Sequence, residues 1–346
     1  MPVLLLAHGG DASIPPLTPA RLLAEGRVEP VPAALLLLAA GLYLLGVRRL
    51  RARGDRWSGW RTASWLVGGL GVVAVATMSG LGPYGDVLFS VHMAQHMLLS
   101  MVAPIFLALG APVTLALRTL APGGRRALLA VLHSRVARVL MFPAVGWVLF
   151  VGSPFAMYFS GWFPAALENE WLHQLMHAHF VLVGCLFFWP LVGLDPVPGR
   201  VPYPLRFLLV FAALPFHAIL GLSIMDSPTL LAAGYYLGLH LGWADPASDQ
   251  RLGGGLLWAS GDLVGLLMLG AVAVQWMRAS EREAAREDRR LDRLAAQSRA
   301  AQSRAPAPGP RPPADGAGGQ EPAGPELMPV WWATEERRTE ERRTDR

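Results

Sequence analysis

The sequence has a single cysteine, Cys185, no lysine, and few charged residues of any kind. One cysteine cannot form a disulfide within the chain, and no Cys-x-x-Cys pair is present to act as a redox couple or to bind a metal through thiolates. Charged residues make up only 16% of the 346 residues, whereas hydrophobic residues make up 53%. This composition excludes an ordinary soluble domain.

The apolar residues gather in seven blocks of roughly the length that a membrane-spanning helix needs. A helix that rises about 1.5 Å per residue crosses the ~30 Å hydrocarbon core of a bilayer with about 20 residues. The predicted spans are residues 31–47, 63–81, 87–109, 139–159, 173–194, 205–225 and 253–277. The sequence therefore predicts an all-α polytopic membrane protein with seven transmembrane helices.

The distribution of arginine predicts the orientation of these helices. All but Arg21, Arg27 and Arg251 lie in three alternate loops or in the tail after Met277. Because basic loops stay in the cytoplasm, the N-terminus is predicted outside and the C-terminus inside. We expect a short extracytoplasmic segment (1–30), a seven-helix membrane domain (31–277) and a charged, mostly disordered cytoplasmic tail (278–346). The positive charge thus indicates orientation in a lipid bilayer and not binding to nucleic acid.

Six of the nine histidines fall in the outer half of the predicted spans, on three different helices. They are His92, His96, His173, His177, His179 and His217. An unpaired polar group in hydrocarbon costs several kcal/mol, so these imidazoles need partners. His92 and His96, like His173 and His177, are four residues apart, which puts each pair on one helix face. His179 points about 200° away from His177. Two imidazoles at this spacing can bind one metal ion, and a neighbouring helix can supply the remaining ligands.

Methionines run beside the histidines. Met93, Met97 and Met101 share the third predicted span, and Met176 and Met225 lie at similar depth. Imidazole together with thioether sulfur suits Cu(I), whereas carboxylates are too few for a di-iron site. A methionine stripe at helical spacing is also typical of simple packing.

Asp262 lies about 14 Å below the outer face in the last predicted span. A carboxylate at that depth needs a partner. It could bind a metal, orient an imidazole or carry a proton. A hydrogen bond to a neighbouring serine or tryptophan would explain it equally well.

Four stretches resemble the CtaG-type cytochrome c oxidase assembly factors, a family of seven-helix bacterial membrane proteins. They are FSVHMAQHMLLSMVAPIFLALGAPV, HQLMHAHFVLVGCLFFWPLVGLDPVP, LPFHAILGLSIM and DQRLGGGLLWASGDLVGLL. The resemblance covers about residues 28–278 and leaves out the tail. His92, His96, His173, His177, His217 and Asp262 fall on its motif positions, so it implies that these residues bind the metal.

The resemblance also implies a location and a role. It implies a multi-pass protein of the bacterial plasma membrane that helps haem–copper oxidases mature by binding or delivering copper. The expected partners are cytochrome c oxidase subunits or other copper-delivery proteins, and no enzymatic activity is expected.

Two other functions remain open. A haem held by His96 with His177 or His217 would make the chain a membrane redox protein. A transporter would use Asp262 and the histidines to line a path. The inner halves of the spans carry almost no polar residue to continue such a path, and no inverted repeat is evident.

Overall fold

The structure is a computed structural model, which describes residues 14–196 and 201–304. Within these residues every regular element is a helix, which confirms the all-α prediction. Contacts divide the chain into two units, Met1–Ala284 and Ala285–Arg346. The candidate site belongs entirely to the first unit.

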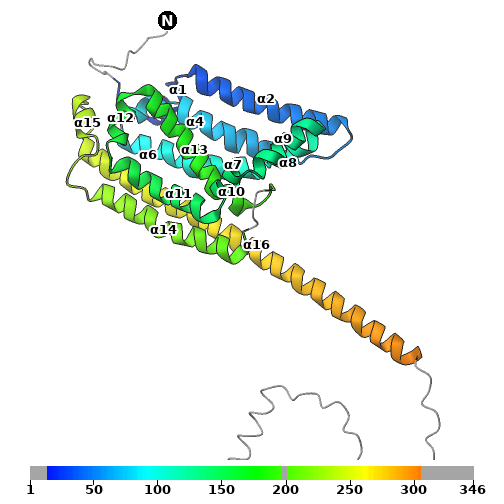
Figure 1. The fold of residues 1–346 in the computed structure, drawn as a ribbon. Coiled ribbons are helices and arrows are strands. Elements are labelled where there is room, and N and C mark those ends of the chain that lie inside the picture. Colours follow the sequence, from blue (N-terminus) through cyan, green and yellow to red (C-terminus); the bar gives the residue numbers. More distant parts are fainter. Residues whose placement is uncertain (1–13, 197–200, 305–346) are drawn as a thin grey trace, which may run out of the picture. The chain divides into compact units, whose positions relative to one another are not determined.

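Six helical stretches in the described residues are long and apolar enough to cross a membrane (Figure 1). They are α2 (Pro30–Ala52), Gly59–Met78, Phe89–Thr119, α13 (Glu170–Val192), α14 (Tyr203–Met225) and the part Pro246–Ala300 of α16 (Pro246–Arg304). The second is built from α3 (Gly59–Ala63), the π-helical η1 (Ser64–Gly71) and α4 (Val72–Met78). The third is built from α6 (Phe89–Met97), the π-helical η2 (Leu98–Val102), α7 (Ala103–Leu109) and α8 (Pro112–Thr119).

The span predicted at residues 139–159 is a bent pair of helices. It begins with α11 (Pro143–Tyr158) and turns by 72° into α12 (Trp162–Glu168). The hydroxyl of Ser160, just before this second helix, accepts a hydrogen bond from the backbone nitrogen of Trp162 at 3.3 Å. When this pair is taken as one span, the structure has the seven spans that the sequence predicts.

Shorter helices precede the first span or connect the spans. They are α1 (Pro19–Ala24), α5 (Leu81–Gly85), α9 (Pro122–Leu132), α10 (Arg135–Leu140) and α15 (Ala233–Gly238).

The described part of the predicted tail is helical. The sequence predicts a charged, mostly disordered tail from residue 278 whose first part, up to Leu294, extends the last helix, and α16 continues to Arg304. Alanine, arginine and glutamate favour a helix, and Arg290 pairs with Glu287 at 3.2 Å, one turn away. Residues 305–346 lie outside the described residues, so the prediction for them stays a prediction.

The close approach of α13 to η2 sets the relative position of the helices that carry the histidines. α13 packs against α7, η2 and α11 (Figure 1). At the tightest point, a Cβ added to Gly184 would lie 2.1 Å from the carbonyl oxygen of Ser100. Glycine is therefore required for this separation between the two backbones.

Small residues also bring α14 and α16 together. A Cβ on Gly221 would lie 2.7 Å from the carbonyl oxygen of Gly254, and the reverse distance is the same. Further along, the ring of His217 packs against Gly261, where a Cβ would approach its Cδ2 to 2.8 Å. The glycines of the last span thus form a helix interface of the kind that membrane proteins use.

A buried carboxylate, that of Asp195, follows the end of α13 and accepts hydrogen bonds from α8 and α13. Asp195 accepts hydrogen bonds from the backbone nitrogens of Val113 and Thr114, at 3.2 and 2.7 Å, and from the indole of Trp189 at 3.1 Å. It thereby caps the first turn of α8. Asp195 is therefore paired within the protein, whereas the Nε2 atoms of His173 and His177, near the beginning of α13, have no partner within the described chain.

The orientation of the termini stays a prediction, which fusion reporters can test. A reporter that is active only outside the cytoplasm is expected to work after Glu168 and to fail after Arg125, because the arginine-rich loops are retained inside. Activity of both fusions, measured in whole cells at matched expression, would be compared with a cytoplasmic reporter at the same sites. The reverse pattern would contradict the orientation.

Candidate metal centre

Four imidazoles from two helices converge near the beginnings of α6 and α13. His92 and His96 lie on α6, and His173 and His177 lie on α13. We call these four residues the histidine cluster. Ligand nitrogens of His92, His96 and His173 all lie within 4.8 Å of one another. Among the described residues this is the only group of three or more His, Cys, Asp or Glu that meets that spacing. The ring of His177 lies 4.4 Å from that of His173 and 5.8 Å from that of His96.

The histidine cluster is buried, yet most of its ring nitrogens have no hydrogen-bond partner. His92 and His96 are fully buried, and His177 is 7% exposed. The Nε2 atoms of His92, His96 and His173 are unpaired within the described chain, as are both nitrogens of His177. Each buried polar atom left without a partner costs about 1–3 kcal/mol. Such a concentration is unusual in a native protein, and a bound ion or ordered water would supply the missing interactions.

Two hydrogen bonds orient the imidazoles of α6. The Nδ1 atom of His92 bonds to the carbonyl oxygen of Gly85 at 3.3 Å, and Nδ1 of His96 bonds to the hydroxyl of Tyr158 at 2.6 Å. A carbonyl can only accept, so it fixes His92 as the tautomer that is protonated at Nδ1 and free at Nε2. Metal-binding histidines are typically held in this way through the nitrogen that does not bind the metal.

Aromatic rings enclose the histidine cluster. The ring of Phe163 lies 5.4 Å from that of His92, and the ring of Phe180 lies 4.4 Å from that of His96. Phe163 is fully buried and Phe180 nearly so. These rings keep water away from the imidazoles, which strengthens every electrostatic interaction inside the cluster.

A carboxylate lies at the more exposed edge of the histidine cluster. Oδ1 of Asp86 is 3.6 Å from Nδ1 of His173, and the hydroxyl of Tyr235 donates to the backbone carbonyl of Asp86 at 3.0 Å. Burial raises the pKa of Asp86 to about 6, although Arg27 acts in the opposite direction. Asp86 is therefore mostly ionised at pH 7 and can attract a cation toward His173.

His217 and Asp262 do not belong to the group of residues whose ligand atoms lie within 4.8 Å of one another. His217 lies on α14, where its Nδ1 bonds to the carbonyl oxygen of Ala213 at 3.1 Å. Asp262 lies on α16 and accepts a hydrogen bond from the indole of Trp258 at 2.7 Å, as the tryptophan alternative anticipated. Depth in the membrane and the motif positions of the resembled family brought these two residues into the prediction, but neither fixes the direction in which a helix face points.

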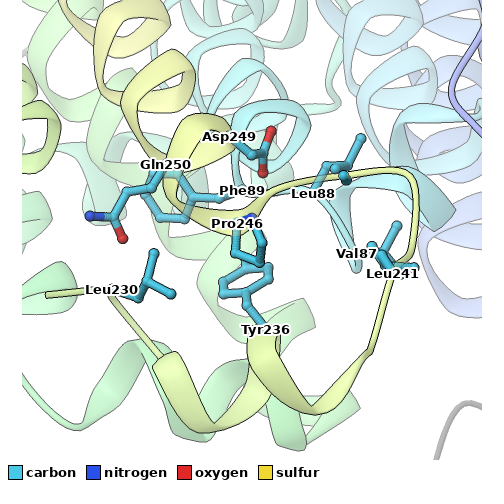
Figure 2. Close-up of a pocket in the computed structure, with 10 residues that line it drawn as sticks. Val87, Leu88, Phe89, Leu230, Tyr236, Leu241, Pro246, Asp249 and Gln250 are labelled. Atoms are coloured by element: carbon cyan, nitrogen blue, oxygen red, sulfur yellow. The ribbon is translucent and has the colours of Figure 1, made fainter.

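Asp249 and Gln250 fix the helices around the site, a role that the sequence motif alone did not reveal. Asp249 accepts hydrogen bonds from the backbone nitrogen of Ser90, at 3.3 Å, and from its hydroxyl. Gln250 accepts from the backbone of Leu231 at 2.7 Å and donates to the carbonyl of Ile224 at 3.3 Å. Figure 2 shows both side chains at the start of α16, around a cavity that Phe89 and Tyr236 also line. Asp249 thus anchors the turn of α6 that precedes His92.

Together, the apolar helices and the buried imidazoles define a multi-pass membrane protein with a candidate metal centre near one end of its helices. The chain belongs to the cytochrome c oxidase caa3 assembly factor family, whose model matches residues 41–279. This match confirms the resemblance seen in the sequence and, with the apolar helices, supports a multi-pass protein of the bacterial membrane.

Mycobacterial proteins are similar to most of the chain. An uncharacterized protein of Mycobacterium bovis is 42% identical over 286 residues, which cover 80% of this chain and 43% of that protein. One of Mycobacterium leprae is 40% identical over 270 residues, which cover 76% of this chain and 41% of that protein. The chain thus spans less than half the length of these relatives. No solved structure gave a significant match.

Proposed function

We propose that the chain binds Cu(I) at the histidine cluster and supplies it to a haem–copper cytochrome c oxidase during assembly. The observation that carries this proposal is the set of buried Nε2 atoms of His92, His96 and His173 that have no partner within the described chain. Three nitrogens that bind one ion at about 2 Å lie about 3.5 Å apart in a trigonal arrangement. Since one ring nitrogen of each of these three histidines already lies within 4.8 Å of the other two, small side-chain movements suffice.

The surroundings favour a monovalent ion. The ligands are neutral imidazoles enclosed by Phe163 and Phe180, and the nearest carboxylate, Asp86, lies at the edge. The Born cost of burying an ion grows with the square of its charge, so a divalent ion costs about four times as much. Imidazole is a good ligand for several transition metals. Among the described residues, Asp86 is the only carboxylate that forms an ion pair with the histidine cluster, and a single negative charge shifts the preference toward Cu(I).

The contacts favour an ion over haem, the alternative ligand. A haem held by His96 and His177 would have to fit between rings whose centroids are 5.8 Å apart. His96 already contacts the ring of Phe180 at 4.4 Å and the hydroxyl of Tyr158 at 2.6 Å. Both neighbours would have to move before a macrocycle could enter.

Anaerobic titration of the full chain tests the proposed function. The protein is purified in detergent through a tag without histidine and titrated with Cu(I) against a coloured competing chelator. We expect saturable binding of Cu(I) and no Soret band in the spectrum of the same sample. A Soret band without copper binding would show that the histidine cluster holds haem, and neither signal would show that the imidazoles are structural.

The variant Tyr158→Phe is expected to weaken Cu(I) binding at the histidine cluster by about 10–100-fold, because His96 loses the hydrogen bond that orients it. The variant Tyr236→Phe is a matched control, since the hydroxyl of Tyr236 is buried without a partner within the described residues. It is expected to bind Cu(I) like the parent in the same titration. An equal loss of Cu(I) affinity in both variants would show a general effect of removing a tyrosine hydroxyl.

A further inference from the structure

Tyr158 also lines a small cavity that the histidine cluster does not share. The cavity has a volume of about 20 Å³, which is room for one water molecule or one ion. Its lining includes Met97, Ser100, Ser153, Tyr158 and His217. We call it the Tyr158 cavity. It contains two of the residue types that the sequence suggested for Cu(I), an imidazole and a thioether, on two different helices.

The imidazole of His217 has one nitrogen left for a ligand. Its Nδ1 bonds to the carbonyl oxygen of Ala213 at 3.1 Å, so Nε2 is the free position. The hydroxyl of Ser153, which lines the same cavity, is buried and has no hydrogen-bond partner within the described chain. The cavity is thus lined by at least one polar atom, the hydroxyl of Ser153, whose interactions the protein itself does not complete.

A carboxylate, that of Asp262, follows the residue of α16 on which His217 packs. The ring of His217 packs against Gly261, which directly precedes Asp262 in the chain. Trp258 holds Oδ2 of Asp262, while Oδ1 is buried without a partner within the described chain. A monovalent cation near His217 would lower the cost of burying this carboxylate, and the carboxylate would lower the cost of burying the cation.

We propose that the Tyr158 cavity is a second Cu(I) position, in which Nε2 of His217 and the sulfur of Met97 bind the ion and Asp262 balances its charge. This inference rests on the proposed function, because it assumes that copper reaches the histidine cluster. Tyr158 contacts both places: its hydroxyl bonds to His96, and its side chain lines the cavity. Met97 follows His96 directly in α6. The two positions are therefore neighbours, and an ion can pass from imidazoles alone to an imidazole and a thioether by exchange of neutral ligands.

Copper stoichiometry of the full chain tests the second position. We expect the parent to bind two Cu(I) ions, and X-ray absorption at the copper edge to show a sulfur ligand once the second ion is bound. The variants His217→Ala and Met97→Leu are each expected to bind one ion, with no sulfur signal. Retention of that first ion at the affinity of the parent shows that each variant is folded. In Asp262→Asn the second ion is expected to bind about tenfold more weakly.

The variant Met93→Leu is the matched control. Met93 is a buried methionine of the same helix, but it packs near Gly253 and does not line the Tyr158 cavity. It is expected to keep both ions and the sulfur signal. A parent that binds one ion, with no change in His217→Ala, would overturn the second position and leave the histidine cluster standing. A parent that binds no copper would overturn both.

Discussion

His96→Ala is expected to weaken Cu(I) binding at the histidine cluster by at least about tenfold, which corresponds to about 1.4 kcal/mol. It is also expected to stop oxidase maturation. His96 is fully buried, its Nε2 has no partner within the described chain, and its ring lies 4.0 Å from that of His92. Removing it takes away one of the three histidines whose ligand nitrogens lie within 4.8 Å of one another. Competitive titration measures the affinity, and oxidase activity of membranes measures the maturation.

The fold is expected to survive this substitution. Alanine is well tolerated in a helix, and the change removes a buried nitrogen that the protein leaves unpaired. His133→Ala is the control, because His133 is an exposed histidine whose ring bonds only to the backbone of its own helix, at Leu129. It should match the parent in both measurements. If His96→Ala inserts normally and binds copper like the parent, the imidazoles of the cluster are structural.

Gly184→Ala is expected to have the largest effect on stability. The added Cβ would lie 2.1 Å from the carbonyl oxygen of Ser100, and a backbone atom cannot move aside as a side chain can. Overpacking of this kind costs about 1–3 kcal/mol and occasionally more, and we expect a value at the upper end. Because α13 must shift away from η2, His173 and His177 would also move relative to His92, and Cu(I) affinity should fall.

Gly152→Ala provides the comparison for Gly184→Ala. Gly152 lies in α11 and is exposed, and a Cβ there would meet no atom within 4 Å. Alanine also has the higher helix propensity, so this variant should be as stable as the parent or slightly more so. Thermal unfolding in detergent, with and without Cu(I), measures both effects. Equal stability of the two variants would show that α13 and η2 are not held at the separation described above.

The sequence predicts where along a helix a residue lies better than it predicts the direction in which its side chain points around the helix axis. Apolar blocks give the spans, and a spacing of four residues places His92 with His96 and His173 with His177 on shared faces. These pairs do lie together in the structure. The bend between α11 and α12 was not predicted, because residues 160 and 161 stop the helix locally within an apolar region that continues on both sides.

Contacts between distant parts of the chain could not be read from spacing. Tyr158 bonds to His96 across 62 residues, and Asp249 bonds to Ser90 across 159. No periodic pattern connects such positions. His217 was grouped with the cluster because its depth is similar, although depth leaves the angle about the helix axis undetermined. Which helices are neighbours, and which faces they present, depends on close approaches such as the one at Gly184.

The π-helical turn η2 changes the direction in which side chains of the third span point: residues before it and after it face different neighbours than in an uninterrupted α-helix. A turn with i→i+5 hydrogen bonds contains one residue more than an α-helical turn, and each residue of an α-helix advances about 100° around the axis. The residues after η2 are thus rotated by about that angle relative to an uninterrupted α-helix. Before the turn, His92 and His96 face α13. After it, Phe106 and Leu107 pack against Gly68 and Gly69 of η1. Deleting one residue within η2 would restore a uniform helix, and only one of these two faces could then meet its partner.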